Sequence, residues 1–400
     1  MTASGPPHLA VALSGAGWHP LAWREPDARP AELLSARYWI DVVGAADRAG
    51  IELITIADTL RRRPPTTDGI DRPISDLAAG HLDSTLIAAR VAPTTRFAGI
   101  APSIVATHTE PFHTAKAIAT LDFVSHGRAG VIVDVAGSAP DARLFGRRTL
   151  PADARVRDAE LFDEAADYVE VLRRLWDSWE DDAEIRDVAT GRFVDRDKLH
   201  YIDFAGKYFS VRGPSITPRP PQGQPIVAVT AAGTEAVGFA GAAADIAFTG
   251  AHDPASAAQA AGDLRRARDA AGRAAEPLHV FADVLVHLDD RAAAAQDRRT
   301  RLDDLLGTPY TGGVPVFSGT AESLADLVVA LTEPGTGVTG VRLRPATIPH
   351  DLDQITRHLI PELQRRKLFR TPDGPTSLRG RLGLATPISR YAPATAGAGR

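Results

Sequence analysis

Residues 96–135 read RFAGIAPSIV ATHTEPFHTA KAIATLDFVS HGRAGVIVDV and contain one complete strand–helix–strand unit. The apolar runs at 96–100 and 130–135 predict two buried strands, and the run at 110–124 predicts the helix between them. Parallel neighbours need a crossover of this kind, whereas antiparallel neighbours are joined by short turns. This stretch therefore predicts an α/β fold with a parallel sheet.

The same alternation of short apolar runs and helical runs continues along the whole chain. Six further strands are expected, at 9–13, 52–56, 226–229, 245–249, 278–287 and 340–343. Further helices are expected at 31–48, 81–90, 157–179, 234–243, 254–273, 288–305, 320–333 and 350–366. Eight such strands favour a (β/α)8 TIM barrel over an open doubly wound sheet. No Gly-rich phosphate loop follows the first strand, which also weakens the doubly wound alternative.

Three long stretches interrupt this alternation, at about 14–30, 136–156 and 180–224. The first two directly follow expected strands, and the third follows the helix after the fourth strand. Segments that follow strands of a barrel lie at its C-terminal face, where active sites form. Insertions of this length are usually functional. We expect one inserted barrel domain over 1–385 and a flexible tail over 386–400.

The amino-acid composition excludes most of the catalytic chemistry that a protein can perform with its own side chains alone. The 400 residues include no Cys and no Asn, and the net charge is −5. Without Cys there is no disulfide, no thiolate nucleophile and no Fe–S cluster, and no metal site is expected. The net charge argues against nucleic-acid binding, and no apolar run is long enough to cross a membrane. We expect a cytoplasmic protein, and an enzyme of this composition would borrow a cofactor.

Several polar and aromatic residues follow expected strands and are candidates for a binding site. Asp58 is either a hydrogen-bond acceptor or general base at a ligand, or a helix cap or salt-bridge partner of Arg61–Arg63. Ser103 either bonds a ring system or caps the next helix. Trp18, His19 and Trp23 either cover a planar ligand or pack a long loop.

The start of the helix expected at 234–243 is a further candidate. Gly233 and Thr234 open this helix, where exposed N–H groups and the positive end of the helix dipole suit a phosphate. The alternative is that the two residues merely cap the helix.

Read together, the segments resemble one branch of the bacterial-luciferase-like flavin monooxygenases. This branch contains nitrilotriacetate monooxygenase, pristinamycin synthase and dibenzothiophene-sulfone monooxygenase. The resemblance runs nearly from end to end and rests on ordered motifs at 17–24, 56–58, 109–113, 119–122, 127–130, 175–182, 208–214, 221–223, 239–249, 360–371 and 377–384.

The resemblance implies a fold, a cofactor and partners. The family fold is an inserted (β/α)8 barrel, as the strand pattern also indicates. Members use reduced FMN that a separate NAD(P)H-dependent reductase delivers. Oxygen then forms a peroxyflavin, which oxygenates or oxidises a small organic or natural-product substrate. The barrels commonly form homodimers or homotetramers, and neither a metal nor a membrane is involved.

The resemblance also implies roles for individual residues. Asp58 stands where the family places an acid against the flavin ring, and Ser103 stands where a Thr usually contacts the ring edge. His19 and Trp23 match the loop that lines the flavin and substrate side. His108 stands where a Tyr is common, on the substrate side. Because His titrates near neutral pH, His19 or His108 is expected to exchange a proton during catalysis.

Other positions depart from the family at expected flavin contacts. The family commonly has Trp-Asn and then Thr-Ser within the stretch 131–136, a Tyr at Phe162, and Gln-Ala-Gly-Ser-Ser near 229–234. Either the contacts are rebuilt, with Asp134, Thr230, Gly233 and Thr234 as substitutes, or flavin binding is weak or lost. The second alternative describes a binding or accessory protein, or an enzyme of a non-redox step. A variant that uses the deazaflavin F420 ranks below FMN.

Overall fold

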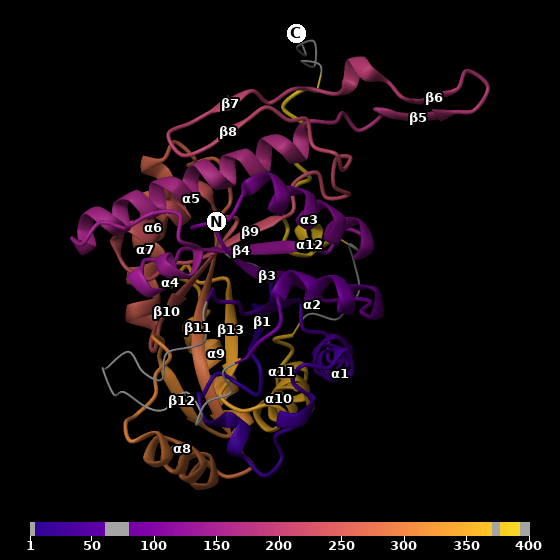
Figure 1. Cartoon of the computed structure of the whole chain (residues 1–400). Coiled ribbons are helices and arrows are strands. Elements are labelled where there is room, and N and C mark those ends of the chain that lie inside the picture. The colour runs from indigo at the N-terminus through magenta and orange to yellow at the C-terminus, as the bar shows by residue number, and fades with distance from the viewer. Residues whose placement is uncertain (1–4, 61–79, 370–376, 393–400) are drawn as a thin grey trace.

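A computed structural model describes residues 5–60, 80–369 and 377–392. Within these residues eight parallel strands close into a barrel surrounded by helices, which confirms the predicted (β/α)8 fold (Figure 1). The barrel strands are β1 (His8–Leu13), β2 (Leu53–Ile56), β3 (Gly99–Val105), β4 (Gly130–Asp134), β9 (Ile226–Thr230), β10 (Ile246–Gly250), β11 (His279–Leu288) and β13 (Gly340–Pro345).

The barrel closes because β1 pairs with β2 along one edge and with β13 along the other. The strand β11 is long enough for two neighbours on the same side. Its first half pairs with β10, and its second half pairs with the short strand β12 (Val316–Gly319). Because the barrel is closed, each of its eight strands has a neighbour on both sides. None of them therefore has an edge that is unpaired over the whole length of the strand.

All eight expected strands are present, but β3 differs in its bounds. It begins at Gly99 and continues to Val105, whereas the sequence pattern suggested 96–100. Pro102 lies in the middle of β3 and has no N–H to donate to a neighbouring strand, so it interrupts the sequence signal of a strand. The strand nevertheless continues, since Ser103 and Val105 are in register with residues of β4.

The helices follow the expected order around the barrel. They are α1 (Ala36–Arg48), α2 (Ser84–Val91), α3 (Pro111–Val124), α5 (Ala154–Asp177), α6 (Thr234–Ala243), α7 (Pro254–Ala270), α8 (Ala292–Leu306) and α9 (Ala321–Leu331). The helix expected at 350–366 consists of α10 (His350–Gln354), a π turn at Ile355–Leu359, and α11 (Ile360–Arg365). Pro361 has no N–H and its ring crowds the carbonyl four residues earlier, so the widened turn before it relieves this conflict.

The interrupting stretches contain short elements of their own. The stretch 136–156 holds α4 (Ala139–Phe145), and 180–224 holds two small antiparallel pairs. The pair β5 (Glu184–Asp187) and β6 (Arg192–Val194) extends away from the barrel, while β7 (Phe204–Ala205) and β8 (Ser210–Val211) lie beside α5 (Figure 1). Among the described residues, no helix is long and apolar enough to cross a membrane.

Buried polar residues tie the elements together at the N-terminal end of the barrel. Asp122 at the end of α3 accepts hydrogen bonds from the N–H of Ala129 at 3.0 Å and from the Gln222 side chain at 2.6 Å. Gln222 accepts one from the N–H of Arg379 at 2.8 Å, and Arg379 donates to Asp245 at 3.2 Å. These residues belong to motifs on which the family resemblance rests. Several of those motifs therefore stabilise the fold.

A short helix, α12 (Leu378–Arg381), closes the same end of the barrel. Leu378 is fully buried. Gly99 permits this approach, because a Cβ on Gly99 would lie only 2.6 Å from a methyl group of Leu378. Leu378 belongs to an apolar cluster inside the barrel, made of Ala10, Leu53, Ala101, Ile132, Ile226, Ala228, Ile246, Phe248, Phe281, Leu378, Leu382 and Leu384. Apolar side chains thus fill much of the interior at this end, and the cavity described below lies at the other.

Candidate active site

Four of the residues predicted to contact a cofactor lie around one cavity at the C-terminal end of the barrel. Asp58 follows β2, Ser103 lies in β3, Asp134 ends β4 and Thr230 ends β9. The cavity has a volume of about 120 Å³ and is lined by Trp18, Thr55, Ala57, Asp58, Ser103, Ile132, Asp134, Thr230, Arg342 and Arg344. Residues far apart in the sequence meet here because parallel strands end at the same face.

Asp58 is held in place by three hydrogen bonds. One carboxylate oxygen accepts from the N–H of Thr59 at 2.7 Å and contacts Nε2 of His81 at 3.1 Å. The other accepts from the N–H of Ser84, the first residue of α2, at 2.8 Å. Burial alone would raise the pKa of this carboxyl, but these hydrogen bonds lower it overall. Asp58 therefore stays ionised at the cavity wall. Its predicted alternative partners, Arg61–Arg63, lie outside the described residues.

Asp134 differs from Asp58 in its electrostatics. Burial raises the pKa of Asp134, although Arg342, Arg344 and a hydrogen bond from Ser103 act in the opposite direction. The carboxyl of Asp134 is therefore the acid of this cavity that most readily keeps its proton.

Two arginines and one aspartate form a buried ionic cluster in the same part of the barrel. Arg342 and Arg344 both come from β13 and both donate to Asp283 of β11, with Nε–oxygen distances of 3.0 Å and 2.9 Å respectively. All three residues are less than 10% exposed. The guanidinium of Arg342 lies 3.6 Å from the ring centre of Phe248, and that of Arg344 lies 4.3 Å from the ring centre of Trp18.

Sequence reasoning missed this cluster, although a signal was present. In β13 the apolar Val341 and Leu343 alternate with Arg342 and Arg344, so both arginines lie on one face of the strand. Val341 and Leu343 belong to the core cluster that includes helix residues, which leaves the barrel interior for the arginines. The sequence cannot show their partner, because Asp283 reaches Arg342 only through the register between β11 and β13.

His19 and Trp23 line a neighbouring cavity of about 80 Å³, which shares Ala57 and Asp58 with the first. Nδ1 of His19 accepts a hydrogen bond from the N–H of Leu21 at 3.1 Å. Its Nε2 lies 3.4 Å from a carboxylate oxygen of Asp303. Both ring nitrogens thus face protein groups.

His108 lines a third cavity, of about 250 Å³, whose lining shares no residue with the other two. Its ring stacks on Phe145 with centroids 5.0 Å apart, and neither ring nitrogen has a hydrogen-bond partner. Burial and the nearby Arg148 lower the pKa of His108, so its ring is neutral. The structure thus separates His108 from His19 and Trp23, with which it was grouped as a substrate contact.

The start of α6 presents backbone N–H groups as expected. Gly233 precedes the helix with φ of 90°, and no side chain caps the first turn. Residues 232–235 are exposed, and Glu235 places a negative charge in this turn. Phe162 packs against Phe239 at 5.8 Å between ring centres, where a Tyr hydroxyl is common in the family. Thr234 carries the one hydroxyl group within 232–235.

Comparisons with known proteins agree with this architecture. The family model described as luciferase-like monooxygenase matches residues 18–334. N-acetyl-S-(2-succino)cysteine monooxygenase of Bacillus subtilis (strain 168) is 27% identical, over 96% of this chain and 98% of that protein. Nitrilotriacetate monooxygenase component A of Aminobacter aminovorans is 26% identical, over 96% and 98%.

A solved structure extends the likeness to three dimensions. Riboflavin lyase, crystallised with modified FMN and its substrate riboflavin, superposes with a TM-score of 0.84 at 23% identity. The match covers 95% of this chain and 96% of that one. At this identity the superposition shows the shared fold.

Proposed function

The chain belongs to the luciferase-like monooxygenase family and is thus an oxidoreductase, and we propose that it uses reduced FMN and O2 on a small organic or natural-product substrate. The protein would act in the cytoplasm, and a separate NAD(P)H-dependent flavin reductase would supply the reduced FMN. The name of one relative, component A of nitrilotriacetate monooxygenase, supports a system of more than one component. By the family pattern, the barrel would act as a homodimer or homotetramer.

The observation that carries this proposal is that Asp58, Ser103, Asp134 and Thr230 share one cavity. Small-molecule pockets span about 300–1,000 Å³, so a cavity of about 120 Å³ admits one edge of a ring system and not a whole cofactor. Its polar wall and the Trp18 ring fit the polar edge and the face of a flavin. When bound, FMN would supply the electrons that reduce O2.

The protein would contribute orientation and exclusion of water. The ionised Asp58 can accept a hydrogen bond from a ring N–H, while Ser103 and Thr230 can donate to ring oxygen or nitrogen atoms. The N–H groups at the start of α6 and the hydroxyl of Thr234 fit a phosphate. Glu235 repels an anion there, which agrees with weak retention of a cofactor that must be exchanged with a reductase.

Proton transfer is the role proposed for the two histidines. His19 lines a cavity that borders Asp58, but its nitrogens face Leu21 and Asp303, so its ring must turn before it reaches a ligand. His108 has two unpartnered nitrogens but lines a separate cavity. If turnover coupled to substrate survives the replacement of both rings, neither has this role.

The proposal is tested by anaerobic titration of the protein with oxidised and with reduced FMN, followed by fluorescence and calorimetry. We expect the reduced form to bind at micromolar concentrations or below. Asp58→Asn should weaken this binding about 10- to 100-fold, as expected for a lost hydrogen bond to a charged group. Asp182→Asn is the control. The exposed carboxylate of Asp182 pairs with Lys198, and both residues are distant in the sequence from those that line the cavity.

Two other outcomes favour other functions. A folded protein that binds neither form of FMN favours an accessory protein or an enzyme of a non-redox step, as the departures at Phe162 and 229–234 suggest. Tight binding of the deazaflavin F420 in place of FMN favours the F420 variant. A positive FMN titration is followed by oxygen-dependent turnover with an added reductase and candidate substrates.

A further inference from the structure

The cavity beside His108 is built largely by two of the stretches that interrupt the barrel pattern. Its lining comprises residues 108–110, Arg147, Arg148, Glu164 and residues 208–211. The two arginines belong to the stretch 136–156, and residues 208–211 belong to the stretch 180–224. The volume is about 250 Å³, close to the lower end of the range for small-molecule pockets. Long insertions are usually functional, so the contents of this cavity matter.

His108 combines two unfavourable features. Only 8% of the residue is exposed, and neither Nδ1 nor Nε2 has a hydrogen-bond partner among the described residues. Burial of a polar group without a partner costs free energy. The backbone φ of His108 is 72°, in the left-handed region that is unfavourable for a residue with a side chain. An unfavourable conformation of this kind is often kept for a function.

A second polar group without a partner lines the same cavity. The hydroxyl of Tyr208 is buried and has no hydrogen-bond partner in the part of the chain that the structure describes. The ring of His108 is neutral, because burial and the nearby Arg148 lower its pKa. A neutral imidazole has one donor and one acceptor nitrogen, and a phenol hydroxyl can both donate and accept. The two side chains thus offer a ligand donors and acceptors but no charge.

The charged side chains at the cavity are present in balanced pairs. Two ion pairs lie at its wall, Arg148–Glu164 at 2.5 Å and Arg147–Glu110 at 3.3 Å. Asp141, which acts on His108, and Lys207, which lies over the ring of Tyr208, add one charge of each sign. An ion that entered would compete with these pairs, whereas an uncharged ligand would leave them intact. The charge balance therefore favours an uncharged ligand.

We propose that this cavity is a second ligand site, which binds an uncharged organic group that both donates and accepts hydrogen bonds, such as a primary amide. The amide N–H can donate to the acceptor nitrogen of His108, and the amide oxygen can accept from the hydroxyl of Tyr208. Phe209 adds an apolar surface to the wall. Different residues line this cavity and the one at Asp58, so the inference is independent of flavin binding.

The test uses three planar probes of nearly equal shape that differ in charge, namely benzamide, benzoate and benzamidinium. Each is titrated into the wild type, and binding is followed by the nitrogen-15 resonances of the imidazole rings. The resonances of His108 are identified by their loss in His108→Leu. We expect benzamide to shift them saturably with a Kd of about 1 mM, as befits a small fragment. Benzoate and benzamidinium should bind at least about tenfold more weakly.

Variants at the two unpartnered groups test how benzamide is held. Tyr208→Phe removes only the hydroxyl and should weaken benzamide binding about 3- to 10-fold, as expected for one lost hydrogen bond. His108→Leu, followed by calorimetry, should weaken it by at least about as much. His113→Leu is the matched control, because His113 is an exposed histidine five residues further along the chain, in α3. It should leave the Kd of benzamide unchanged.

Each of the other outcomes decides against the inference. Binding of benzoate or benzamidinium as tight as that of benzamide overturns it, and so does the absence of saturable binding in a folded wild type. Benzamide binding that both His108→Leu and Tyr208→Phe leave unchanged overturns it as well. If His108→Leu does not fold, Tyr208→Phe decides alone. Benzamide binding at His108 in a protein that binds no flavin would leave this inference intact and overturn the proposed function.

Discussion

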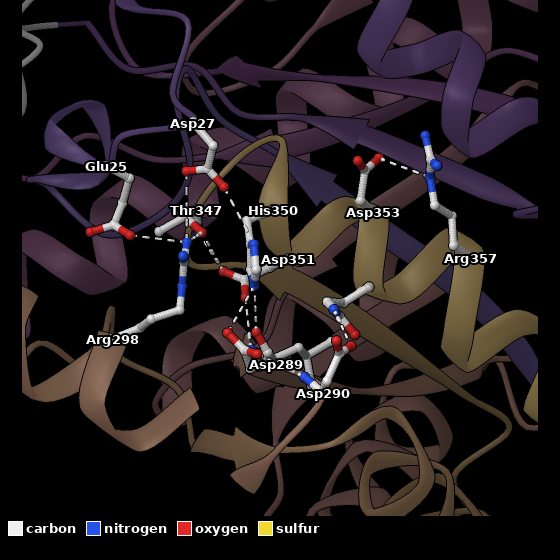
Figure 2. A network of polar contacts seen from close by, with 12 residues as sticks. Glu25, Asp27, Asp289, Asp290, Arg298, Thr347, His350, Asp351, Asp353 and Arg357 are labelled. Carbon is white, nitrogen blue, oxygen red and sulfur yellow. Dashed lines mark hydrogen bonds and ion pairs between the residues drawn. The ribbon is translucent and has the colours of Figure 1, made fainter. Parts of the chain in front are cut away.

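At the scale of single residues, two buried titratable groups near the end of β11 act in opposite directions. Asp351 accepts hydrogen bonds from the N–H groups of Leu288 and Thr347, both at 2.7 Å, within the polar network of Figure 2. Burial raises its pKa from 3.8 to about 6. For His287 burial, assisted by the nearby His19, lowers the pKa from 6.5 to about 3.

These shifts predict opposite pH dependences of stability. The contribution of Asp351 is complete below pH 4 and is lost as the pH rises through 6, because the ionised form is disfavoured in the fold. The contribution of His287 is complete above pH 6.5 and is lost as the pH falls towards 3, because only the unfolded chain takes up the proton. Between pH 4.5 and 6.5 each changes the free energy of unfolding by about 2 kcal/mol.

The measurement is urea unfolding of the wild type, Asp351→Ala and His287→Leu at pH 4.5 and 6.5. The deficit of Asp351→Ala relative to the wild type should be larger at pH 4.5, and that of His287→Leu larger at pH 6.5. Each variant serves as the control for the other. Deficits that do not change with pH in either variant would contradict the assignment.

The sequence allowed part of the site to be predicted at this scale. Asp58 and Asp134 could be found because each ends or follows a buried strand, and the ends of parallel strands converge. The separation of His108 from His19 could not, since it depends on how the segments containing Phe145 and Tyr208 fold over the barrel. The grouping of Arg342 and Arg344 with Asp283 depends on the register between two strands, which no local sequence pattern predicts.

At the scale of elements, the loop after β1 is attached closely to the segment after β13. The N–H of Trp18 donates to the carbonyl of Pro345 at 2.9 Å, and the N–H of Ile348 donates to Ala16 at 2.7 Å. Gly17 lies between these bonds with φ of 135°, and a Cβ there would meet the carbonyl oxygen of Ala346 at 2.3 Å. This attachment positions Trp18 over Arg344.

Gly17→Ala should therefore be far more damaging than Gly15→Ala. Gly15 also has a positive φ, of 49°, but a Cβ there meets nothing within 4 Å. We expect about 1–2 kcal/mol lost for Gly15→Ala from backbone strain alone. For Gly17→Ala we expect at least about 3 kcal/mol, because the backbone clash adds to the strain. Urea unfolding measures both, and equal losses would show that the loop simply moves away.

Elements were predictable where burial leaves a clear pattern. The barrel strands are continuous apolar runs because both of their faces are covered, so all eight were found. The pairs β5–β6 and β7–β8 are short and largely exposed, and their sequences carry no such pattern. The strand β12 was missed for a related reason, since its residues 316–318 are only half-buried.

At the scale of the whole molecule, α12 determines whether the barrel interior is sealed. Leu378 is fully buried against strands from around the barrel. Leu378→Ala should lower the free energy of unfolding by about 2–5 kcal/mol, because the cavity it leaves is enclosed by rigid strands. Leu144→Ala is the control: Leu144 is 64% exposed, and a change below about 0.5 kcal/mol is expected. Thermal or urea unfolding compares the two, and similar losses would contradict a sealing role.

The closure of β1 on β13 also has a consequence for synthesis on the ribosome. β1 is made first among the barrel strands and its second neighbour is made last. One edge of β1 therefore stays without a partner while nearly the whole chain is translated, and unpaired strand edges recruit other chains. A nascent chain that stalls before β13 would expose that edge, so this edge is protected from aggregation only after β13 has been made.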